Sequence, residues 1–183
     1  MKTEYQKMLA GELYDAGDGE LMSLRIKARE LIHACNQTMY DKEKRSAILQ
    51  QLGIKAGSNI DIQVPFFCDY GCHIETGDNF FANFNCIFLD CNYIKIGDNV
   101  FLGPGVQIYT AHHPVIAAER IKGPELASPV TIGNNVWVGG GSIICAGVSI
   151  GDNTTIGAGS VVVKNIPANV VAVGNPCTVI KKL

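Results

Sequence analysis

Two adjacent histidines, His112 and His113, lie in the segment YTAHHP at residues 109–114 and account for half of the four histidines in the chain. An imidazole with an unperturbed pKa of about 6.5 can take up a proton near neutral pH. A histidine held next to a hydroxyl group can therefore act as a general base, which accelerates a reaction by roughly 10²- to 10⁴-fold. The segment is a candidate catalytic site, and the surrounding elements must hold the histidine in place.

The sequence around this segment repeats every six residues. The longest run of aliphatic residues at this spacing is Ile132, Val138, Ile144, Ile150, Ile156 and Val162. An earlier run, Ile96, Leu102 and Ile108, ends just before the histidines, and a weaker copy begins at Thr76. The two runs are in phase, since residues 108 and 132 are 24 positions apart, or four repeats. The histidines therefore stand where a regular scaffold is interrupted.

A period of six fits neither an amphipathic helix nor an alternating strand, and it is typical of a parallel β-helix with three flat faces per coil. One aliphatic side chain per face would point inward and stack on its counterpart in the next coil. Gly-Asp-Asn and Gly-Asn-Asn groups would form the corners, because glycine and asparagine tolerate a positive φ. The sequence predicts a mainly β fold, with the β-helix over residues 57–183 and a protruding loop at 111–129.

Residues 1–56 form a different kind of segment, which we expect to be helical. Apolar residues recur there at helical spacing, with charged residues between them: Leu21, Leu24, Ala28, Leu31 and Cys35. Asp41 can cap a second short helix, which Gly53 would end. Because a β-helix exposes its ends, these helices and the C-terminal segment NPCTVIKKL are the expected caps.

The composition excludes several classes of protein. Apolar residues make up 47% of the 183 residues and charged ones 17%, which is typical of a folded globular protein. The net charge of −2 provides no basic surface for nucleic acid or an anionic membrane. No signal peptide or transmembrane run is visible, and the seven cysteines form no CxxC pair. We expect a cytoplasmic protein with free thiols.

Several segments together resemble the maltose and galactoside O-acetyltransferases, a family of hexapeptide-repeat acyltransferases. They span nearly the whole chain: MLAGELYDA, ARELIHACN, FFCDYGCHI, FFANFNCIFLD, IYTAHHP, PVTIGNNVWVGGGSIICAGVSIGDN and GNPCTVIKKL. The maltose-type members are the more similar ones. The resemblance implies a left-handed β-helix, a homotrimer with active sites at subunit interfaces, and acetyl transfer from acetyl-CoA to a sugar hydroxyl, with a glucosyl 6-hydroxyl as the expected position.

The resemblance also implies a base. In the family it is the histidine immediately before a proline, which is His113 here, and His112 is then its neighbour. His113 would take the proton of the sugar hydroxyl, and the oxygen would attack the thioester directly, without an acyl-enzyme and without a metal. The loop at 111–129 would help to enclose the site between subunits, in keeping with the functional roles of most long loops in compact domains.

For the acceptor sugar, the resemblance implies contacts from Asn83, with Asn85 as a close rival. It implies further contacts from Asp69, Asp90 and Asp15. Carboxylates suit hydrogen bonding to sugar hydroxyls, although aspartates are also common at the corners of this fold. Some relatives have a second acid after the Asp90 position, where this chain has Cys91.

For acetyl-CoA, the resemblance implies a groove between adjacent β-helices. The residues at the family's cofactor positions are Trp137, Gly140, Ala158, Val163, Lys164, Thr178 and Lys181. Trp137, the only tryptophan, could instead fill a face of the coil. A backbone N–H near Gly140 could stabilise the oxyanion of the reaction.

Other functions fit parts of the pattern. Xenobiotic acetyltransferases of the chloramphenicol type and nodulation-type acetyltransferases share the fold and similar base motifs. A hexapeptide-repeat carbonic anhydrase would need three histidines on zinc, and adjacent β-residues such as His112 and His113 point to opposite faces. A non-catalytic assembly protein would not need the combination of His113, Asn83 and Trp137. The helical segment favours a sugar acceptor among these alternatives.

The C-terminal segment generates a first prediction. Many relatives have arginine where this chain has Thr178, and a guanidinium there would pair with coenzyme A phosphates. We expect Thr178→Arg to lower the KM for acetyl-CoA without raising kcat, measured from initial rates of thiol release. An unchanged KM would show that this segment does not contact the cofactor.

Overall fold

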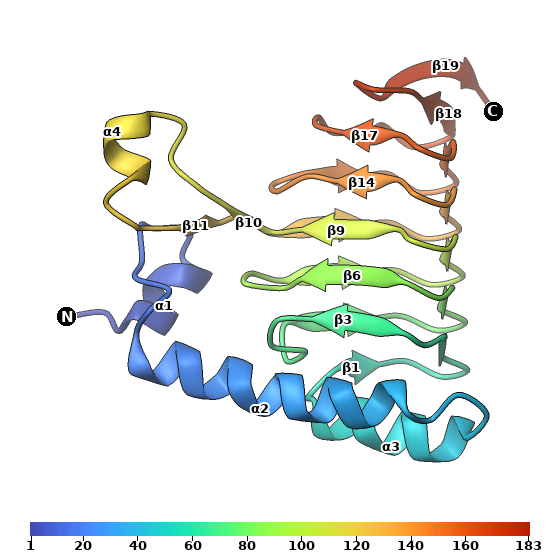
Figure 1. Ribbon diagram of the computed structural model, residues 1–183. Helices are drawn as coiled ribbons and strands as arrows, with labels where there is room; N and C mark the ends of the chain where they lie inside the picture. The colour runs from blue at the N-terminus through green and yellow to red at the C-terminus, as the bar shows by residue number, and fades with distance from the viewer.

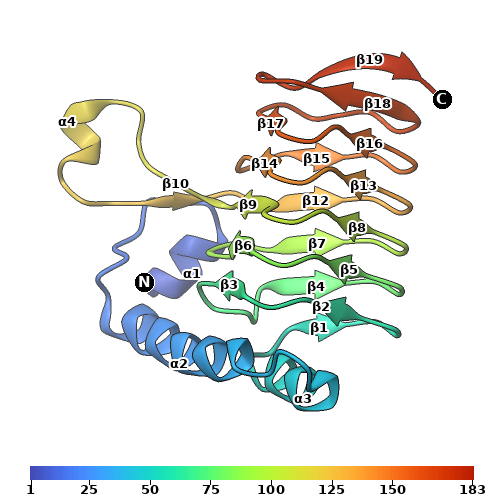
Figure 2. The ribbon, with the colours of Figure 1, turned by 45° about the vertical axis from the view of Figure 1, so that its right-hand side comes forward.

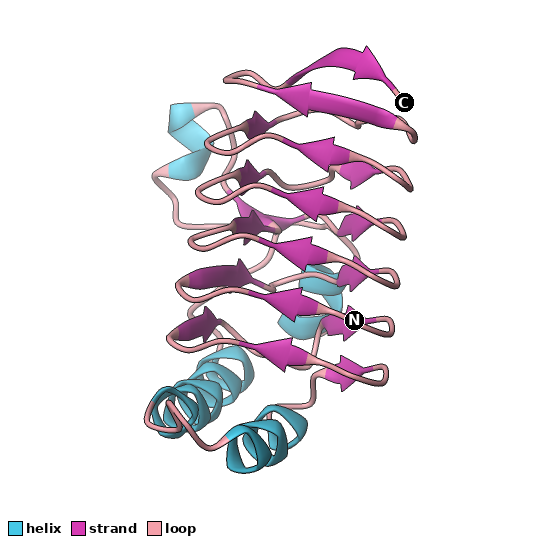
Figure 3. Cartoon of the chain, turned by 90° about the vertical axis from the view of Figure 1, so that its right-hand side faces the viewer, coloured by secondary structure: helices cyan, strands magenta, loops and turns pink.

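The computed structural model describes residues 1–183 and shows a left-handed parallel β-helix with helices at one end, which confirms the predicted fold class (Figure 1). Each coil passes through three flat faces, which can be followed in Figure 3. Face 1 contains β1 (Lys55–Ala56), β4 (Ile74–Thr76), β7 (Ile94–Ile96), β12 (Val130–Ile132) and β15 (Ser149–Ile150). Face 2 contains β2 (Asp61–Ile62), β5 (Phe81–Ala82), β8 (Phe101–Leu102), β13 (Trp137–Val138), β16 (Thr155–Ile156), β18 (Val170–Val173) and β19 (Thr178–Lys182). Face 3 contains β3 (Phe66–Cys68), β6 (Cys86–Leu89), β9 (Gln107–Tyr109), β14 (Ile143–Ile144) and β17 (Val161–Val162).

The interior is a column of aliphatic side chains. Every residue of the longest six-residue run, from Ile132 to Val162, is at most 2% exposed, as the period predicts. Parallel pairing places Ile132 beside Ile96 in one neighbouring coil and Ile150 in the other. Full burial of such a side chain contributes roughly 1.5–3 kcal/mol relative to exposure. The six-residue period therefore records one inward residue per face.

The edge between faces 1 and 2, which we call edge 1–2, is built from asparagines in the left-handed region. The six with φ between 54° and 59° are Asn59, Asn79, Asn99, Asn135, Asn153 and Asn169. Their side-chain amides form a continuous ladder, each donating to the next at 2.9–3.0 Å. The edge between faces 2 and 3, edge 2–3, instead turns at Gly105, Gly141 and Gly159, with φ of 68–69°. The predicted corner residues are thus confirmed.

Two helices close the N-terminal end of the coils, as predicted. They are α2 (Gly19–Asn36) and α3 (Lys42–Gln51), and the Asp41 carboxylate caps α3 by accepting a hydrogen bond from the Lys44 backbone N–H at 2.9 Å. A third helix, α1 (Glu4–Leu9), is not evident from apolar spacing and begins with a capping box between Thr3 and Gln6. At the other end, β19 pairs antiparallel with β18. No helix combines the length and apolar character needed to cross a membrane.

The interruption at residues 111–129 forms an arm that stands out from the coils (Figure 2). It contains β10 (Ala111–His112), α4 (Ala117–Arg120) and β11 (Leu126–Ala127). The two strands pair antiparallel, with Ala111 opposite Ala127. The arm leaves between β9 and β12, at the edge between faces 3 and 1, or edge 3–1. The two histidines therefore lie at the foot of the arm, next to the rigid coils.

Edge 3–1 is irregular and contains buried polar groups. Asp90, directly after β6, is fully buried, and its Oδ1 accepts hydrogen bonds from the backbone N–H groups of Asp69 and Tyr70, both at 2.9 Å. Its Oδ2 has no hydrogen-bond partner. Burial, opposed by these N–H groups and reinforced by the Asp69 carboxylate, raises the pKa of Asp90 to about 7. A carboxyl group that is neutral in mild acid therefore fixes the turn that carries Asp69.

This raised pKa predicts a pH-dependent stability. Folded Asp90 retains its proton up to about pH 7, whereas an aspartate in an unfolded chain loses its proton near pH 4. The native state therefore binds more protons over this range, and the free energy of unfolding should fall by about 2–3 kcal/mol between pH 5 and pH 8. Asp90→Asn, which keeps the shape and loses the ionisation, should lack this decline.

Urea unfolding of both proteins at the two pH values measures the effect. His73 contributes with the opposite sign, because burial lowers its pKa. Both proteins contain His73, so the difference between them isolates Asp90. If the unfolding free energies of the wild-type protein and Asp90→Asn differ by the same amount at pH 5 and at pH 8, the raised pKa of Asp90 is contradicted.

Candidate active site

A cavity of about 450 Å³ lies at the foot of the arm, between the arm, edge 3–1 and α2. The arm contributes Ala111, His112, His113 and Glu125 to its walls, edge 3–1 contributes Asp69 and Cys91 after Leu89, and the N-terminal segment contributes Ala16, Arg25 and Arg29. Segments far apart in the sequence therefore meet around one opening. The cavity contains imidazole and carboxylate groups, which can serve general acid–base chemistry, and guanidinium groups, which can donate hydrogen bonds to a ligand.

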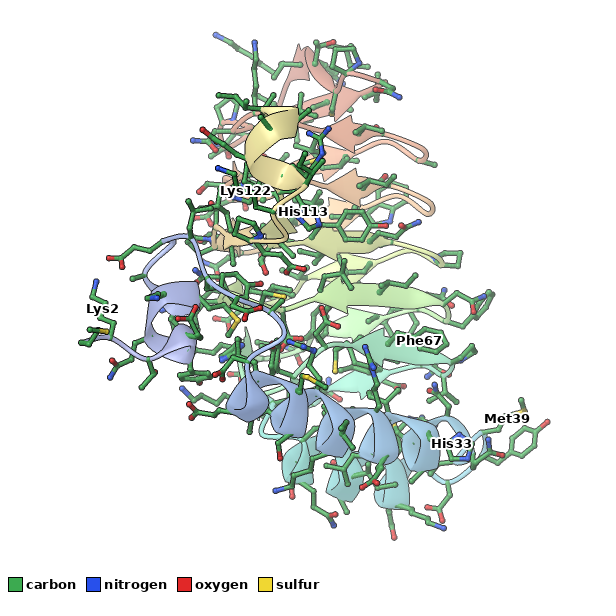
Figure 4. All side chains as sticks on the ribbon, turned by 60° about the vertical axis from the view of Figure 1, so that its left-hand side comes forward. Lys2, His33, Met39, Phe67, His113 and Lys122 are labelled. Atoms are coloured by element: carbon green, nitrogen blue, oxygen red, sulfur yellow. The ribbon has the colours of Figure 1, made fainter.

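The two histidines have different surroundings. The Nε2 atom of His112 is 3.1 Å from Ser128 Oγ, so one of its ring nitrogens is already engaged within the protein. His113 is exposed, lines the cavity and has no hydrogen-bond partner in the chain. Figure 4 shows it at the foot of the arm. The ring of His113 is available to a ligand, whereas one nitrogen of the His112 ring already contacts Ser128.

Asp69 and Cys91 form the wall on edge 3–1. The Cys91 thiol donates to Asp69 Oδ2 at 3.6 Å, a long sulfur hydrogen bond. Burial raises the pKa of Asp69, and this thiol and the guanidinium groups of Arg25 and Arg29 oppose the shift. Asp69 thus lines the cavity, and its contact to the acceptor stays a prediction.

Asp90 requires a correction. The predicted acceptor contact does not fit its position, because the side chain is 0% exposed and does not line the cavity. Its carboxyl group instead holds the backbone of Asp69 and Tyr70 from behind. At this edge Asp69 lines the cavity, and Asp90 supports its backbone.

The opposite wall is formed by arginines that sequence analysis does not single out as site residues. Arg25 donates to Tyr70 Oη at 2.6 Å and to the Ala16 carbonyl, and its guanidinium lies over the Tyr70 ring, 5.7 Å from the centroid. Arg29, one turn later on α2, has no ion-pair or hydrogen-bond partner. Their spacing of four residues places both on one face of a helix. That spacing is the only signal in the sequence, and it does not reveal that this face meets the arm.

Another group of predicted residues lies at edge 2–3, on the far side of face 3 from the cavity. Asn83 follows β5, and Gly140 and Ala158 occupy the same edge in later coils, where Asn83 N–H donates to Leu102 and Gly159 N–H to Gly140. Trp137 is next to this edge on face 2, paired with Phe101, and is 57% exposed. It does not fill the coil. The N–H of Gly140 donates to no acceptor in the protein.

Asn83 and Asn85 differ in backbone conformation, which distinguishes their roles. Asn85 has a φ of 64° and so serves as a left-handed corner residue. Asn83 has no such turn requirement, although its Oδ1 accepts a hydrogen bond from the Phe84 N–H at 2.8 Å. The structure thus gives Asn85 the turn role and leaves Asn83 as the candidate for ligand contact.

The remaining predicted residues lie elsewhere. Asp15 is exposed in the loop between α1 and α2, and it accepts a hydrogen bond from Gly17 N–H at 2.8 Å in a neighbouring hollow beside Lys122. Val163 and Lys164 are on edge 3–1 towards the C-terminal end, after β17. Thr178 and Lys181 are exposed on β19. One chain therefore does not bring all the predicted residues together.

The four histidines do not converge on one point. His33 is on α2, well away from His113 in Figure 4, and His73 is buried against Tyr5. No three His, Cys, Asp or Glu side chains are grouped so that they could hold a metal ion. One chain by itself therefore does not assemble the three-histidine zinc site of the carbonic anhydrase alternative.

Two protein-family patterns match the chain. The maltose acetyltransferase hexapeptide capping motif matches residues 7–52, and the bacterial transferase hexapeptide, with six repeats, matches residues 129–164. A maltose O-acetyltransferase from Clostridium difficile 630 has a similar crystal structure, with 54% identity, a TM-score of 0.96 and coverage of 100% of this chain and 98% of that one.

Two further relatives cover nearly the full chain. A galactoside acetyltransferase solved in complex with coenzyme A is 38% identical, with a TM-score of 0.95 and coverage of 100% of this chain and 92% of that one. Nodulation protein L of Rhizobium meliloti is 42% identical over 179 residues, which are 97% of this chain and 98% of the relative. The similarity extends through both the helical cap and the coils. The chain therefore belongs to the maltose and galactoside acetyltransferase family and is a hexapeptide-repeat acetyltransferase.

Proposed function

We propose that the protein transfers an acetyl group from acetyl-CoA to a sugar hydroxyl, with His113 as the general base. The observation that carries the proposal is the unpartnered imidazole of His113 in a polar cavity at the foot of the arm. The similarity to a maltose and a galactoside acetyltransferase supports a sugar acceptor, and the coenzyme A complex of the latter supports the donor. The expected position of transfer is the 6-hydroxyl of a glucosyl unit.

The proposed reaction is a direct transfer. His113 accepts the hydroxyl proton while the oxygen forms a bond to the carbonyl carbon of the thioester. A backbone N–H such as that of Gly140 can stabilise the resulting oxyanion. The carbon–sulfur bond then breaks, and the imidazolium returns its proton to the departing thiolate. This route needs no metal and no acyl-enzyme.

The cavity suits a neutral polyhydroxy ligand. Its charged side chains are Arg25, Arg29, Asp69 and Glu125, so the formal charges of its walls balance. Guanidinium groups donate and carboxylates accept hydrogen bonds, and a sugar hydroxyl can do both. An aromatic acceptor with fewer hydroxyl groups, such as chloramphenicol, would leave more of these groups unpaired. The similarity to a nodulation protein supports a nodulation-type acceptor as the second candidate.

We propose that the active enzyme is a homotrimer in which each site is shared by two chains. Within one chain, His113 and Asp69 are on edge 3–1, whereas Asn83, Gly140 and Trp137 lie at or beside edge 2–3. Face 1 carries an ion-paired row of Lys55, Glu75 and Lys95, typical of a solvated surface. Faces 2 and 3 and their shared edge expose Phe67, Phe84, Phe101 and Trp137, so these faces are the ones suited to meet other chains.

In such an assembly, acetyl-CoA would lie in the groove between neighbouring chains. Trp137 and the Gly140 and Ala158 corners offer a flat surface and close backbone approach for the pantetheine and thioester. Lys164 and Lys181, towards the C-terminal end, offer positive charge for the phosphates. Val163 and Thr178 complete this set, and Asp15 in the N-terminal segment remains a proposed contact to the acceptor.

The adjacent histidines allow a matched test of the base. We expect His113→Ala to lower kcat by about 10²- to 10⁴-fold in a thiol-release assay with acetyl-CoA and maltose, glucose, a galactoside or chloramphenicol. His112→Ala, which removes a ring held by Ser128, should cost less than about tenfold. An equal loss in both variants, or undiminished activity of His113→Ala, would overturn the assignment, and turnover with chloramphenicol alone would overturn the acceptor class.

Mixing two inactive variants tests the shared site. If His113 and Asn83 serve the same site from different chains, an equal mixture of His113→Ala and Asn83→Ala chains, refolded together, restores about a quarter of the sites in random trimers. Thiol release should therefore rise well above that of either variant alone. A mixture that is no more active than its components would show that each site is built from one chain.

A further inference from the structure

Asn92 occupies a central position in edge 3–1 that no catalytic assignment explains. It lies on edge 3–1 between β6 and β7 and is 2% exposed, so a ligand cannot reach it. Its side-chain nitrogen contacts three backbone carbonyl oxygens: Met8 at 3.2 Å, Leu9 at 3.2 Å and Ala127 at 3.1 Å. A buried amide that satisfies its donors on distant segments holds those segments in one arrangement.

The two segments held by Asn92 are the ones that build the cavity. Met8 and Leu9 form the C-terminal end of α1, and Ala127 is in β11 at the foot of the arm. The other atoms of Asn92 are also engaged, because Oδ1 accepts from Tyr93 N–H and the backbone N–H donates to Thr110 Oγ1, both at 2.8 Å. The amide therefore joins the coils, the N-terminal helix and the arm at one point.

The contact to Ala127 leads directly to the base. Ala127 pairs with Ala111 in the β10–β11 ladder. His112 and His113 follow Ala111 directly in the sequence. The ladder is only two residues long in each strand, so it offers little resistance to movement by itself. Ser128 N–H adds one hydrogen bond to the Thr110 carbonyl at 2.9 Å. The position of the His113 backbone thus depends in part on what anchors β11.

The anchor itself is rigid. Tyr5 Oη on α1 is 2.9 Å from His73 Nε2, and His73 Nδ1 is 2.6 Å from the Asp90 carbonyl oxygen. Because that carbonyl can only accept, Nδ1 carries the proton and Nε2 accepts from the tyrosine. Burial lowers the pKa of His73, which favours this neutral form. Helix α1 is therefore fixed to edge 3–1 independently of Asn92.

We propose that Asn92 is a positioning residue for His113, which clamps the foot of the arm to α1 and so holds the imidazole in the cavity. The inference rests on the proposed role of His113. A base that is displaced by about 1 Å can lose on the order of 10² in rate, even when the displacement originates away from the reacting atoms. The clamp therefore affects chemistry more than cofactor binding.

The test compares Asn92→Ala with Asn36→Ala. Asn36 is a matched control, because its amide also ties a cap helix to the coils, with Nδ2 donating to the Phe66 carbonyl at 3.0 Å and Oδ1 accepting from Phe66 N–H at 2.9 Å, but it does not contact the arm. We expect both variants to lower the melting temperature. Only Asn92→Ala should lower kcat, by about ten- to a hundredfold, with the KM for acetyl-CoA unchanged.

Two additional measurements separate positioning from general damage. In a His113→Ala background, Asn92→Ala should cause no further loss of residual rate, because both changes affect the same group. Amide hydrogen exchange over residues 110–128 should become faster in Asn92→Ala and stay unchanged in Asn36→Ala. If Asn92→Ala does not fold, Asn92→Ser, which keeps one donor, is measured in the same way and should give a smaller loss.

The outcomes distinguish this inference from the proposed function. Full activity of His113→Ala would contradict the proposed base. Loss of activity in His113→Ala with an unchanged kcat in folded Asn92→Ala would overturn only the clamp. An equal loss of kcat in Asn36→Ala, or an equal additional loss in the His113→Ala background, would also overturn it, since both indicate a general structural effect.

Discussion

The stacking of one inward side chain per face on its counterpart in the next coil is the interaction on which the whole structure depends. A single coil cannot bury its apolar residues, so each coil is stable only against its neighbours. This requirement assigns Ile132 and its equivalents to the interior and fixes the pairing register of every strand. The side chains that point outward and those at the three edges remain available for chemistry.

The three edges use this freedom differently. Along edge 1–2 the asparagine ladder satisfies the side-chain amides from coil to coil, which leaves little for a ligand. Edge 2–3 turns through small residues, and the N–H groups of Gly140 and Ala158 have no acceptor in the protein. Edge 3–1 has no regular turn. A buried carboxyl group, the cavity and the arm all lie at this edge. The candidate site residues are thus concentrated at the two edges that border face 3.

The helical segment at the N-terminus does more than close the stack of coils. Arg25 and Arg29 form one wall of the cavity, and Tyr14 donates to the Glu125 carboxylate of the arm at 2.8 Å. The backbones of Tyr14 and Glu125 also exchange hydrogen bonds, at 3.0 and 3.1 Å. A cap that touches the arm in this way ties the end of the scaffold to the geometry of the site, so the cap and the site are one structural unit.

The sequence by itself determined the features that are encoded over a few neighbouring residues. The six-residue period specifies inward side chains, Asn99 and its equivalents specify corners, Asp41 specifies the start of α3, and YTAHHP marks the departure of the arm. Each depends on local backbone preference or on a strict period, which a sequence displays directly. The tertiary structure alone decided that Asp90 is buried behind Asp69, that Arg25 and Arg29 face the arm, and that Asn83 lies on a different edge from His113. These placements arise from how the cap, the coils and the arm pack together, and no local pattern records how residues that are 21 or more positions apart along the chain lie relative to one another.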